Sequence, residues 1–180
     1  MALTVEDGTG VAGADSYISV AYATAYHANL GNDKWTFLSG SQEVALRVAT
    51  LSLDLLYAQN FKGNERFTSQ ELRYPRSSYS DNYDNFVAEG VIPTELKNAV
   101  AEAALIYIVA ELNEPGTGSK ALVQDPDPQA YLQSISESFD GVCAESKTYF
   151  RPVSTTKLIK VSLMLYPHLL QHGASPLVRG

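Results

Sequence analysis

The sequence has 180 residues, of which 45% are hydrophobic and 18% charged, and its formal net charge is −7. This length corresponds to a single domain that can bury a core unaided, and the composition excludes an intrinsically disordered chain. No run approaches the roughly 20 apolar residues that span a bilayer, and no export signal is evident. Cys143 is the only cysteine, which excludes an internal disulfide. We therefore expect a protein made and kept in the cytoplasm, without a membrane partner.

The charge balance bears on nucleic acids. Thirteen basic side chains face twenty acidic ones, whereas proteins that grip duplex DNA neutralise its phosphates with clustered lysine and arginine. An acidic chain without such a cluster is a poor candidate for gripping duplex DNA. It is a better candidate for a surface past which DNA moves without sticking.

The chain is expected to open with an extended arm over residues 1–18, because residues 6–15 are rich in glycine and turn formers and lack helical periodicity. Ser19 is a suitable N-cap for a short helix over 20–30, and Gly31 supplies the stop signal.

A second helix is predicted over 42–57, with Ser41 as its N-cap. Four apolar residues at spacings of four, three and four predict the face that packs in the core: Val44, Val48, Leu51 and Leu55. Arg47 and Asp54 lie two turns apart on one side of this helix. We expect them to form a partly covered ion pair or a contact to the next loop.

Residues 58–91 show no sustained period and predict a long connection, a kind of segment that often has a binding role. A third helix is expected from Pro93 to near Asn113. Its second half is apolar nearly all round, which places it at the centre of a bundle. Residues 19–113 thus form the predicted helical core.

The remaining chain is predicted as a linker over 114–130, a β-hairpin over 131–150, a terminal helix over 155–170 kinked at Pro167, and a tail over 171–180. The spacing of apolar residues in 131–150 also suits a helix, but Asp-Gly at the turn and alternating serines favour the hairpin. The expected fold is mainly α: a small helical bundle in one domain, with an extended N-terminal arm, the long 58–91 connection and the hairpin.

Two motifs could indicate chemistry. Residues 8–13 match G-x-G-x-x-G, but no buried strand precedes them and no βαβ unit follows, so a flexible turn is preferred to a dinucleotide site. His168 and His172 have the spacing of a metal pair without a third ligand nearby. No nucleophile motif is present. We expect no catalytic, cofactor-binding or metal-binding residues, and a protein that is not an enzyme.

Residues 61–86 interleave basic and aromatic side chains, as a single-strand binder requires. Acidic residues offset the basic ones, however, and tyrosine and arginine are equally typical of protein interfaces, so protein contact is favoured over nucleic acid. The predicted interface residues are Phe61, Lys62, Arg66, Phe67, Arg73, Tyr74, Arg76, Tyr79 and Tyr83, with Leu177 and Arg179 in the tail.

The chain resembles a family of tailed-phage head–tail connectors or adaptors, some relatives of which carry a DnaT-like single-stranded-DNA-binding label. The similarity runs in order through most of residues 3–112, and the residues that carry it are 5–10, 14–20, Tyr26, Gly31, Trp35, 45–50, Leu53, Asp54, Tyr57, 61–63, 74–77, Ile92, Pro93 and 96–112.

The resemblance implies a structural virion protein of the neck, assembled in the host cytoplasm. Its subunits would form a ring, a dodecamer, that contacts the portal protein on one side and the next neck protein on the other, with viral DNA passing through the lumen. The family offers no catalytic residues to transfer. The alternative is a single-stranded-DNA-binding accessory protein that uses the aromatic and basic stretch 61–86.

Overall fold

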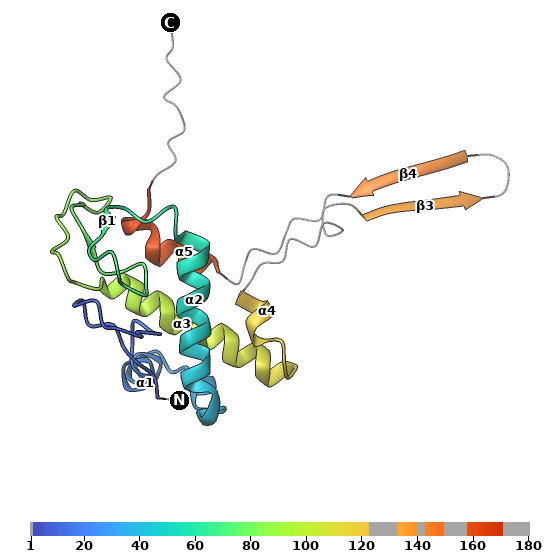
Figure 1. Cartoon of the computed structure of the whole chain (residues 1–180). Helices are drawn as coiled ribbons and strands as arrows, with labels where there is room; N and C mark the ends of the chain where they lie inside the picture. The colour runs from blue at the N-terminus through green and yellow to red at the C-terminus, as the bar shows by residue number, and fades with distance from the viewer. Residues whose placement is uncertain (1, 123–132, 140–142, 150–157, 171–180) are drawn as a thin grey trace, which may run out of the picture.

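The computed structural model describes residues 2–122, 133–139, 143–149 and 158–170. It is mainly α-helical, with one small antiparallel hairpin near the C-terminal end (Figure 1). The predicted fold class is therefore confirmed. The tail over 171–180, with Leu177 and Arg179, lies outside the described residues.

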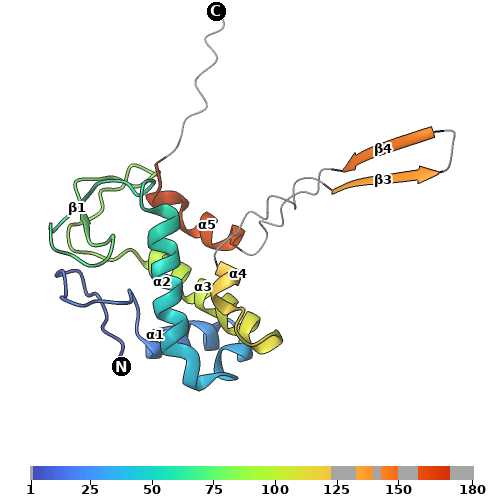
Figure 2. The same cartoon turned by 45° about the vertical axis from the view of Figure 1, so that its right-hand side comes forward.

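Helix α3 (Thr94–Asn113) is the centre of the fold, as predicted from its apolar second half. It packs against α1, α2, α4 and α5, which surround it in Figures 1 and 2. Its buried surface is rich in alanine, so neighbouring helices can approach its backbone closely: Ala99, Ala101, Ala103 and Ala104 are all fully buried.

Helix α1 (Val20–Asn29) begins as expected, because the Ser19 Oγ accepts a hydrogen bond from the Tyr22 amide at 3.2 Å. Two contacts fix α1 to the central helix. The His27 Nε2 lies 3.0 Å from the carbonyl oxygen of Ala101, and the Tyr26 hydroxyl donates to Glu102 at 2.9 Å.

Helix α2 (Gln42–Tyr57) has the predicted bounds, but the predicted buried face is wrong. Val44, Leu51 and Leu55 are 43%, 59% and 69% exposed, and only Val48 is half-buried. The face that packs on α3 is the opposite one, with Ala45, Leu46, Ala49 and Leu53. Small alanines have a weak apolar signal in a sequence, yet they allow the close helix contact that forms this core. Ser41 makes no side-chain cap.

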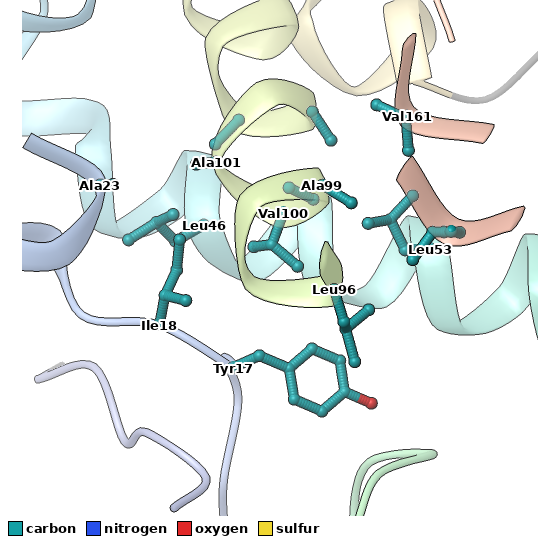
Figure 3. Packing of buried hydrophobic residues seen from close by; sticks show 14 of the residues in the cluster. Tyr17, Ile18, Ala23, Leu46, Leu53, Leu96, Ala99, Val100, Ala101 and Val161 are labelled. Atoms are coloured by element: carbon teal, nitrogen blue, oxygen red, sulfur yellow. The ribbon is translucent and has the colours of Figure 1, made fainter. Parts of the chain in front are cut away.

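The N-terminal segment is extended, as predicted, but it does not stand apart from the body. Val5 and Ser16 form a parallel bridge, and Tyr17 and Ile18 are buried. Figure 3 shows both side chains among core residues of the helices, including Leu46 and Leu96. The role of a free arm is therefore corrected for Ala14 and residues 16–18, which are buried in the body of the fold.

The 58–91 connection contains a minimal antiparallel pair, β1 (Asn64–Glu65) with β2 (Arg76–Ser77), and a cis peptide bond between Tyr74 and Pro75. Gly63 permits the close approach of the two segments. Its φ is +73°, and a Cβ there would lie 2.5 Å from the carbonyl oxygen of Ser77.

The C-terminal part departs from the prediction in two places. A short helix, α4 (Gly118–Leu122), begins within the predicted linker, of which 123–130 lies outside the described residues. The terminal helix α5 covers only Ile159–Leu165 of the predicted 155–170, where residues 155–157 are not described. A 3-10 turn, η4 (Tyr166–His168), follows it, because Pro167 cannot continue the α-helical hydrogen bonds.

The predicted hairpin is confirmed. Strand β3 (Gln133–Phe139) pairs with β4 (Cys143–Tyr149) in antiparallel register, from Gln133 opposite Tyr149 to Phe139 opposite Cys143. The turn signal at Asp140-Gly141 falls between the two strands and outside the described residues.

Candidate nucleic-acid interface

The predicted interface residues of the 61–86 stretch divide into a buried and an exposed group. Four side chains are buried and hold the connection onto the helices: Phe61, Tyr74, Arg76 and Tyr79. Their assignment to a partner surface is therefore corrected. Aromatic residues far apart in a polar segment suggested exposure, but here they build a second layer of core beneath the connection.

Arg76 organises the inner side of this connection. Its Nε donates to the Lys62 carbonyl at 2.7 Å, and its Nη2 donates to the Gly63 and Phe61 carbonyls at 2.6 and 3.3 Å. The Nη1 donates to the Arg73 carbonyl at 3.3 Å. A planar guanidinium is suited to this task, because it can donate in several fixed directions at once.

A chain of hydrogen bonds joins the connection to the C-terminal turn. The Tyr74 and Tyr79 hydroxyls are 3.2 Å apart, and the Tyr79 hydroxyl lies 3.3 Å from the His168 Nδ1. The His168 Nε2 lies 3.4 Å from a Glu95 carboxylate oxygen at the surface. Burial raises the pKa of both tyrosines, so both stay protonated.

His168 thus points into the core. His172 lies outside the described residues. Within the described part of the chain, no cluster of three histidine, cysteine or carboxylate side chains is placed to hold a metal ion.

Asp54 links α2 to the same connection. The sequence predicted either an ion pair with Arg47 or a contact to the next loop, and the structure has the contact to the loop. Its carboxylate accepts from the Tyr17 hydroxyl at 2.7 and 2.9 Å and from the Arg73 amide at 3.0 Å. The Tyr17 hydroxyl in turn accepts from the Tyr74 amide at 3.0 Å. Burial raises the pKa of Asp54 to about 6, against the lowering effect of these donors. Arg47 pairs with Asp15 at 2.5 Å.

Tyr83, the exposed aromatic residue among the remaining predicted interface residues, lies on a turn over residues 81–86, called here the aromatic turn. Asp81 fixes it, because its carboxylate accepts from the Asn85 side-chain amide at 3.0 Å and from the Tyr83 and Asn85 backbone amides at 2.8 and 2.9 Å. The hydrogen bond from the Asn85 side chain is the main cause that lowers the Asp81 pKa. The two rings it presents, Tyr83 and Phe86, are 66% and 69% exposed. The aromatic turn is therefore preformed, with two rings facing solvent.

The aromatic turn is also tied to the C-terminal part of the fold. The Asn82 amide donates to the Pro167 carbonyl at 2.8 Å, and the Asn82 side chain donates to the Tyr166 carbonyl. These contacts hold the aromatic turn in place, and its two rings remain exposed.

Three basic side chains of the 61–86 stretch remain at least partly exposed, and one of them contacts the chain next to the aromatic turn. The Lys62 Nζ donates to the Ser80 carbonyl at 3.1 Å, just before the aromatic turn. The Arg66 guanidinium is exposed and lies 5.1 Å from the centre of the half-buried Phe67 ring. Arg73 is exposed but pairs with Glu65 at 2.7 Å, so part of its charge is neutralised within the chain.

Sequence reasoning placed Phe86 within the aromatic stretch but did not select it as an interface residue. The sequence does contain a signal for this turn, namely the spacing between Asp81 and Asn85. Asp81 and Asn85 flank a tight turn in which an aspartate side chain receives amide hydrogens two and four residues later, and the chain leaves that turn at Phe86.

The glycine motif at 8–13 binds a carboxylate of the chain itself. The buried Glu6 side chain accepts from the amides of Gly8, Gly10 and Val11 at 2.8, 2.9 and 2.9 Å. These are the amides that a phosphate would use, and here they close a local loop. Gly8 and Gly10 have φ values of +103° and +76°, a conformation that favours glycine.

A cleft of about 420 Å³ lies beside α2, lined by Ala14, Asp15, Arg47, Leu51, Asp54, Leu55, Glu71, Leu72 and Arg73. It contains both charge signs and three leucines. Its lining side chains include no serine, cysteine or histidine, so it offers no nucleophile of the common hydrolase types.

These features define a mainly helical protein with a rigid aromatic turn on its surface. Over residues 1–174 the chain matches the family described as "Putative DnaT-like ssDNA binding protein", and it belongs to that family. The match agrees with the DnaT-like label of the relatives noted from the sequence. The match does not support the assignment to the connector family.

No curated protein and no solved structure matches the chain. Among the helices of the described residues, none combines the length and the apolar character needed to cross a membrane.

Proposed function

We propose that this chain is a non-enzymatic accessory protein that binds single-stranded DNA through the aromatic turn and the neighbouring basic side chains. Membership of the DnaT-like family over nearly the whole chain supports the ligand class. The observation that carries the proposed site is the pair of exposed rings, Tyr83 and Phe86, on a turn held rigid by Asp81.

Unpaired bases expose ring faces that stack on aromatic side chains whatever their sequence. A rigid turn lowers the entropy lost on binding, because the two rings are already ordered. Lys62 and Arg66 would contact phosphates on the strand as it passes the rings.

The net charge of −7 limits the affinity that we expect for single-stranded DNA. Only a few phosphates can be neutralised, so the proposed binding is modest in affinity and depends mainly on stacking. Duplex DNA, whose bases are already stacked, is expected to bind much less.

Replacing both Tyr83 and Phe86 by alanine is expected to weaken binding of an oligothymidine by about thirtyfold or more, since stacking contributes roughly 1–3 kcal/mol per base and two rings are removed. The change in affinity is measured by the fluorescence anisotropy of a labelled oligonucleotide. Phe37→Ala is the matched control, because Phe37 is 63% exposed in a different segment. Equal affinity of the double variant and the wild type would refute the proposed site.

A second measurement tests the basic side chains. The affinity for the oligonucleotide is expected to fall with salt in proportion to the phosphates neutralised, and Lys62→Gln or Arg66→Gln should each reduce that slope by about one. If no oligonucleotide binds even at low salt, the single-strand proposal fails as a whole.

A second candidate is the structural virion protein implied by the phage resemblance. In that role, the subunits form a dodecameric ring in the neck, between the portal protein and the next neck protein. Viral DNA passes through the lumen of the ring. One observation favours it: large apolar side chains are exposed on several elements, including Leu55 on α2 and Leu163 on α5, each 69% exposed. Subunits of an assembly use exposed apolar side chains in the contacts with their neighbours.

The two candidates are separated by mixing the protein with a portal protein and imaging the product. A ring seated on the portal, together with no salt-dependent oligonucleotide binding, would replace the first proposal by the second. Oligonucleotide binding without any portal complex would support the first and count against the second.

A further inference from the structure

One exposed aromatic ring near the C-terminal end of the fold has no part in the core or in the proposed site. Among the described residues, the large aromatic side chains with the greatest exposure are Phe37, Tyr83, Phe86 and Tyr166. Tyr83 and Phe86 are the rings of the aromatic turn. Tyr166 begins η4 and is 47% exposed. Its position relative to the aromatic turn decides whether it can contact the same ligand.

The C-terminal turn, residues 166–170, lies directly against the aromatic turn. The Asn82 amide donates to the Pro167 carbonyl at 2.8 Å. The Asn82 side chain donates to the Tyr166 carbonyl, and it lies 3.4 Å from the Leu169 carbonyl. Asn82 is the residue before Tyr83. The backbone of Tyr166 is therefore joined to the segment that presents Tyr83 through one residue.

The C-terminal turn also contacts the start of the long connection. The Lys62 amide donates to the His168 carbonyl at 2.9 Å, and Phe61 and Leu169 form an antiparallel bridge. The Lys62 Nζ donates to the Ser80 carbonyl at 3.1 Å, just before the aromatic turn. Lys62 thus contacts the C-terminal turn through its backbone and the edge of the aromatic turn through its side chain. Its positive charge lies between the two segments that have exposed rings.

The geometry of η4 explains why the Tyr166 ring faces solvent. A 3-10 helix has three residues per turn, so residues two apart point to different sides. His168 is buried and lies 3.3 Å from the Tyr79 hydroxyl, which anchors the C-terminal turn in the core. Tyr166 is left on the outer side of the same anchored turn. Like Tyr83, it is an exposed ring on a backbone held by hydrogen bonds.

The fourth exposed ring lies elsewhere on the molecule. Phe37 precedes α2, whereas the C-terminal turn bonds to Asn60 just after that helix ends, through the Leu170 amide at 2.6 Å. A helix of 16 residues, about 24 Å long, separates the two places. Figures 1 and 2 both show η4, in red, beside the green connection at the end of α2 that lies away from the blue N-terminal helix. Three of the four exposed rings therefore lie on two adjoining turns.

We infer that Tyr166 is a third ring of the single-strand site, so that the DNA strand binds across both the aromatic turn and the C-terminal turn. The inference rests on the proposed function and extends its site. Any unpaired base can stack on an exposed aromatic ring. The aromatic turn also contains the exposed Asp84, which repels phosphates. A further ring adds affinity at this surface without depending on its charge.

The first test measures the affinity of the full chain for an oligothymidine of about ten nucleotides, a length in the range that single-strand sites accommodate. Tyr166→Ala is expected to weaken binding by at least about fivefold, the lower limit for the loss of one stacked base. Tyr166→Phe keeps the ring and is expected to bind like the wild type. Leu163→Ala is the matched control, because Leu163 lies one turn earlier on α5 and is 69% exposed but has no ring. Circular dichroism checks that the variants keep the wild-type helix content.

The second test separates contact with the DNA from support of the fold. An oligonucleotide that contains 5-iodouracil is irradiated with the wild-type chain, and the cross-linked peptides are identified by mass spectrometry. Cross-links are expected at Tyr166 and at Tyr83 or Phe86. A tyrosine that only supports the turn would not be cross-linked.

The outcomes distinguish this inference from the proposed function. If Tyr166→Ala binds like the wild type while the double variant of Tyr83 and Phe86 loses affinity, the third ring is overturned and the proposed site stands. A loss of affinity in Tyr166→Ala without a cross-link at Tyr166, or an equal loss in Tyr166→Phe, would also overturn stacking on this ring. If the wild type binds no oligonucleotide, the inference and the proposed function both fail.

Discussion

Replacing Arg76 by alanine is expected to destabilise the protein by about 3 kcal/mol, one of the two largest effects that we predict for a single substitution. The Arg76 side chain is buried and donates to four backbone carbonyls of the 58–91 connection. Without it, these acceptors lose their partners where water cannot fully replace them. Urea denaturation followed by circular dichroism measures the free energy of unfolding.

Arg76→Lys separates the charge from the geometry. A lysine keeps the positive charge but has one compact ammonium group, which cannot reach acceptors spread around a planar guanidinium. We expect it to restore less than half of the lost stability. A loss below about 1 kcal/mol for Arg76→Ala would show that the connection is held mainly by its buried aromatic residues.

The same substitution has a consequence for the proposed function. Arg76 lies beneath the connection and is not a DNA-contacting residue, yet Arg76→Ala should also weaken oligonucleotide binding, because it loosens the segment that supports Lys62 and the aromatic turn. Binding that stays at the wild-type level in a folded Arg76→Ala protein would show that the aromatic turn is positioned independently, through Asn82 and the C-terminal turn.

The second large effect is a dependence of stability on pH that arises from Asp54. Burial raises its pKa from 3.8 to about 6 in the folded protein. Between these values the folded protein holds a proton that the unfolded chain releases, so raising the pH favours unfolding. The contribution is fully present below pH 3.8 and is lost as the pH rises through 6, and a shift of about two units corresponds to about 3 kcal/mol.

Asp54→Asn is the variant that isolates this contribution, because it keeps the size of the side chain and removes the titration. The difference in unfolding free energy between wild type and Asp54→Asn is expected to fall by about 3 kcal/mol from pH 3.5 to pH 7. Both proteins share every other carboxylate, so the difference cancels groups such as Asp7, whose pKa is lowered and which acts with the opposite sign. A difference that does not change with pH would contradict the raised pKa.

Asp54→Ala addresses the hydrogen bonds instead of the charge. It removes the acceptor of the Tyr17 hydroxyl and the Arg73 amide, and we expect a loss of about 2 kcal/mol near neutral pH. The loss should be larger at pH 4, where the wild type also benefits from the protonated carboxyl. Asp54 thereby joins the N-terminal segment, α2 and the connection through one buried group.

Much of the secondary structure follows from local rules. The bounds of α2, the start of α1 at Ser19, the span of α3 and the hairpin on either side of Asp140-Gly141 agree with predictions from caps, periodicity and turn residues. Each of these signals acts within a few residues, so the rest of the fold does not override it. The short α4 was missed because its five residues follow a glycine- and proline-rich stretch.

The candidate site was predicted only as a region. Residues 61–86 do present basic and aromatic side chains, but which of them face solvent depends on contacts with distant segments. Tyr74 is buried because Tyr17 and the N-terminal segment cover it, and Tyr79 is buried because His168 packs on it from the C-terminal end. Tyr83, with the same residue type, is exposed because Asp81 turns the chain outward there.

The sequence by itself determined that this chain is mainly helical, where its principal helices begin and end, and that an aromatic and basic segment interrupts them. The tertiary structure alone decided which face of α2 is inside and which rings of that segment remain free. The physical reason is that helix boundaries depend on local hydrogen bonds and caps, whereas burial depends on shape. The face of α2 with Ala45, Leu46, Ala49 and Leu53 fits closely against α3, and Val44, Leu51 and Leu55 are left on the outside.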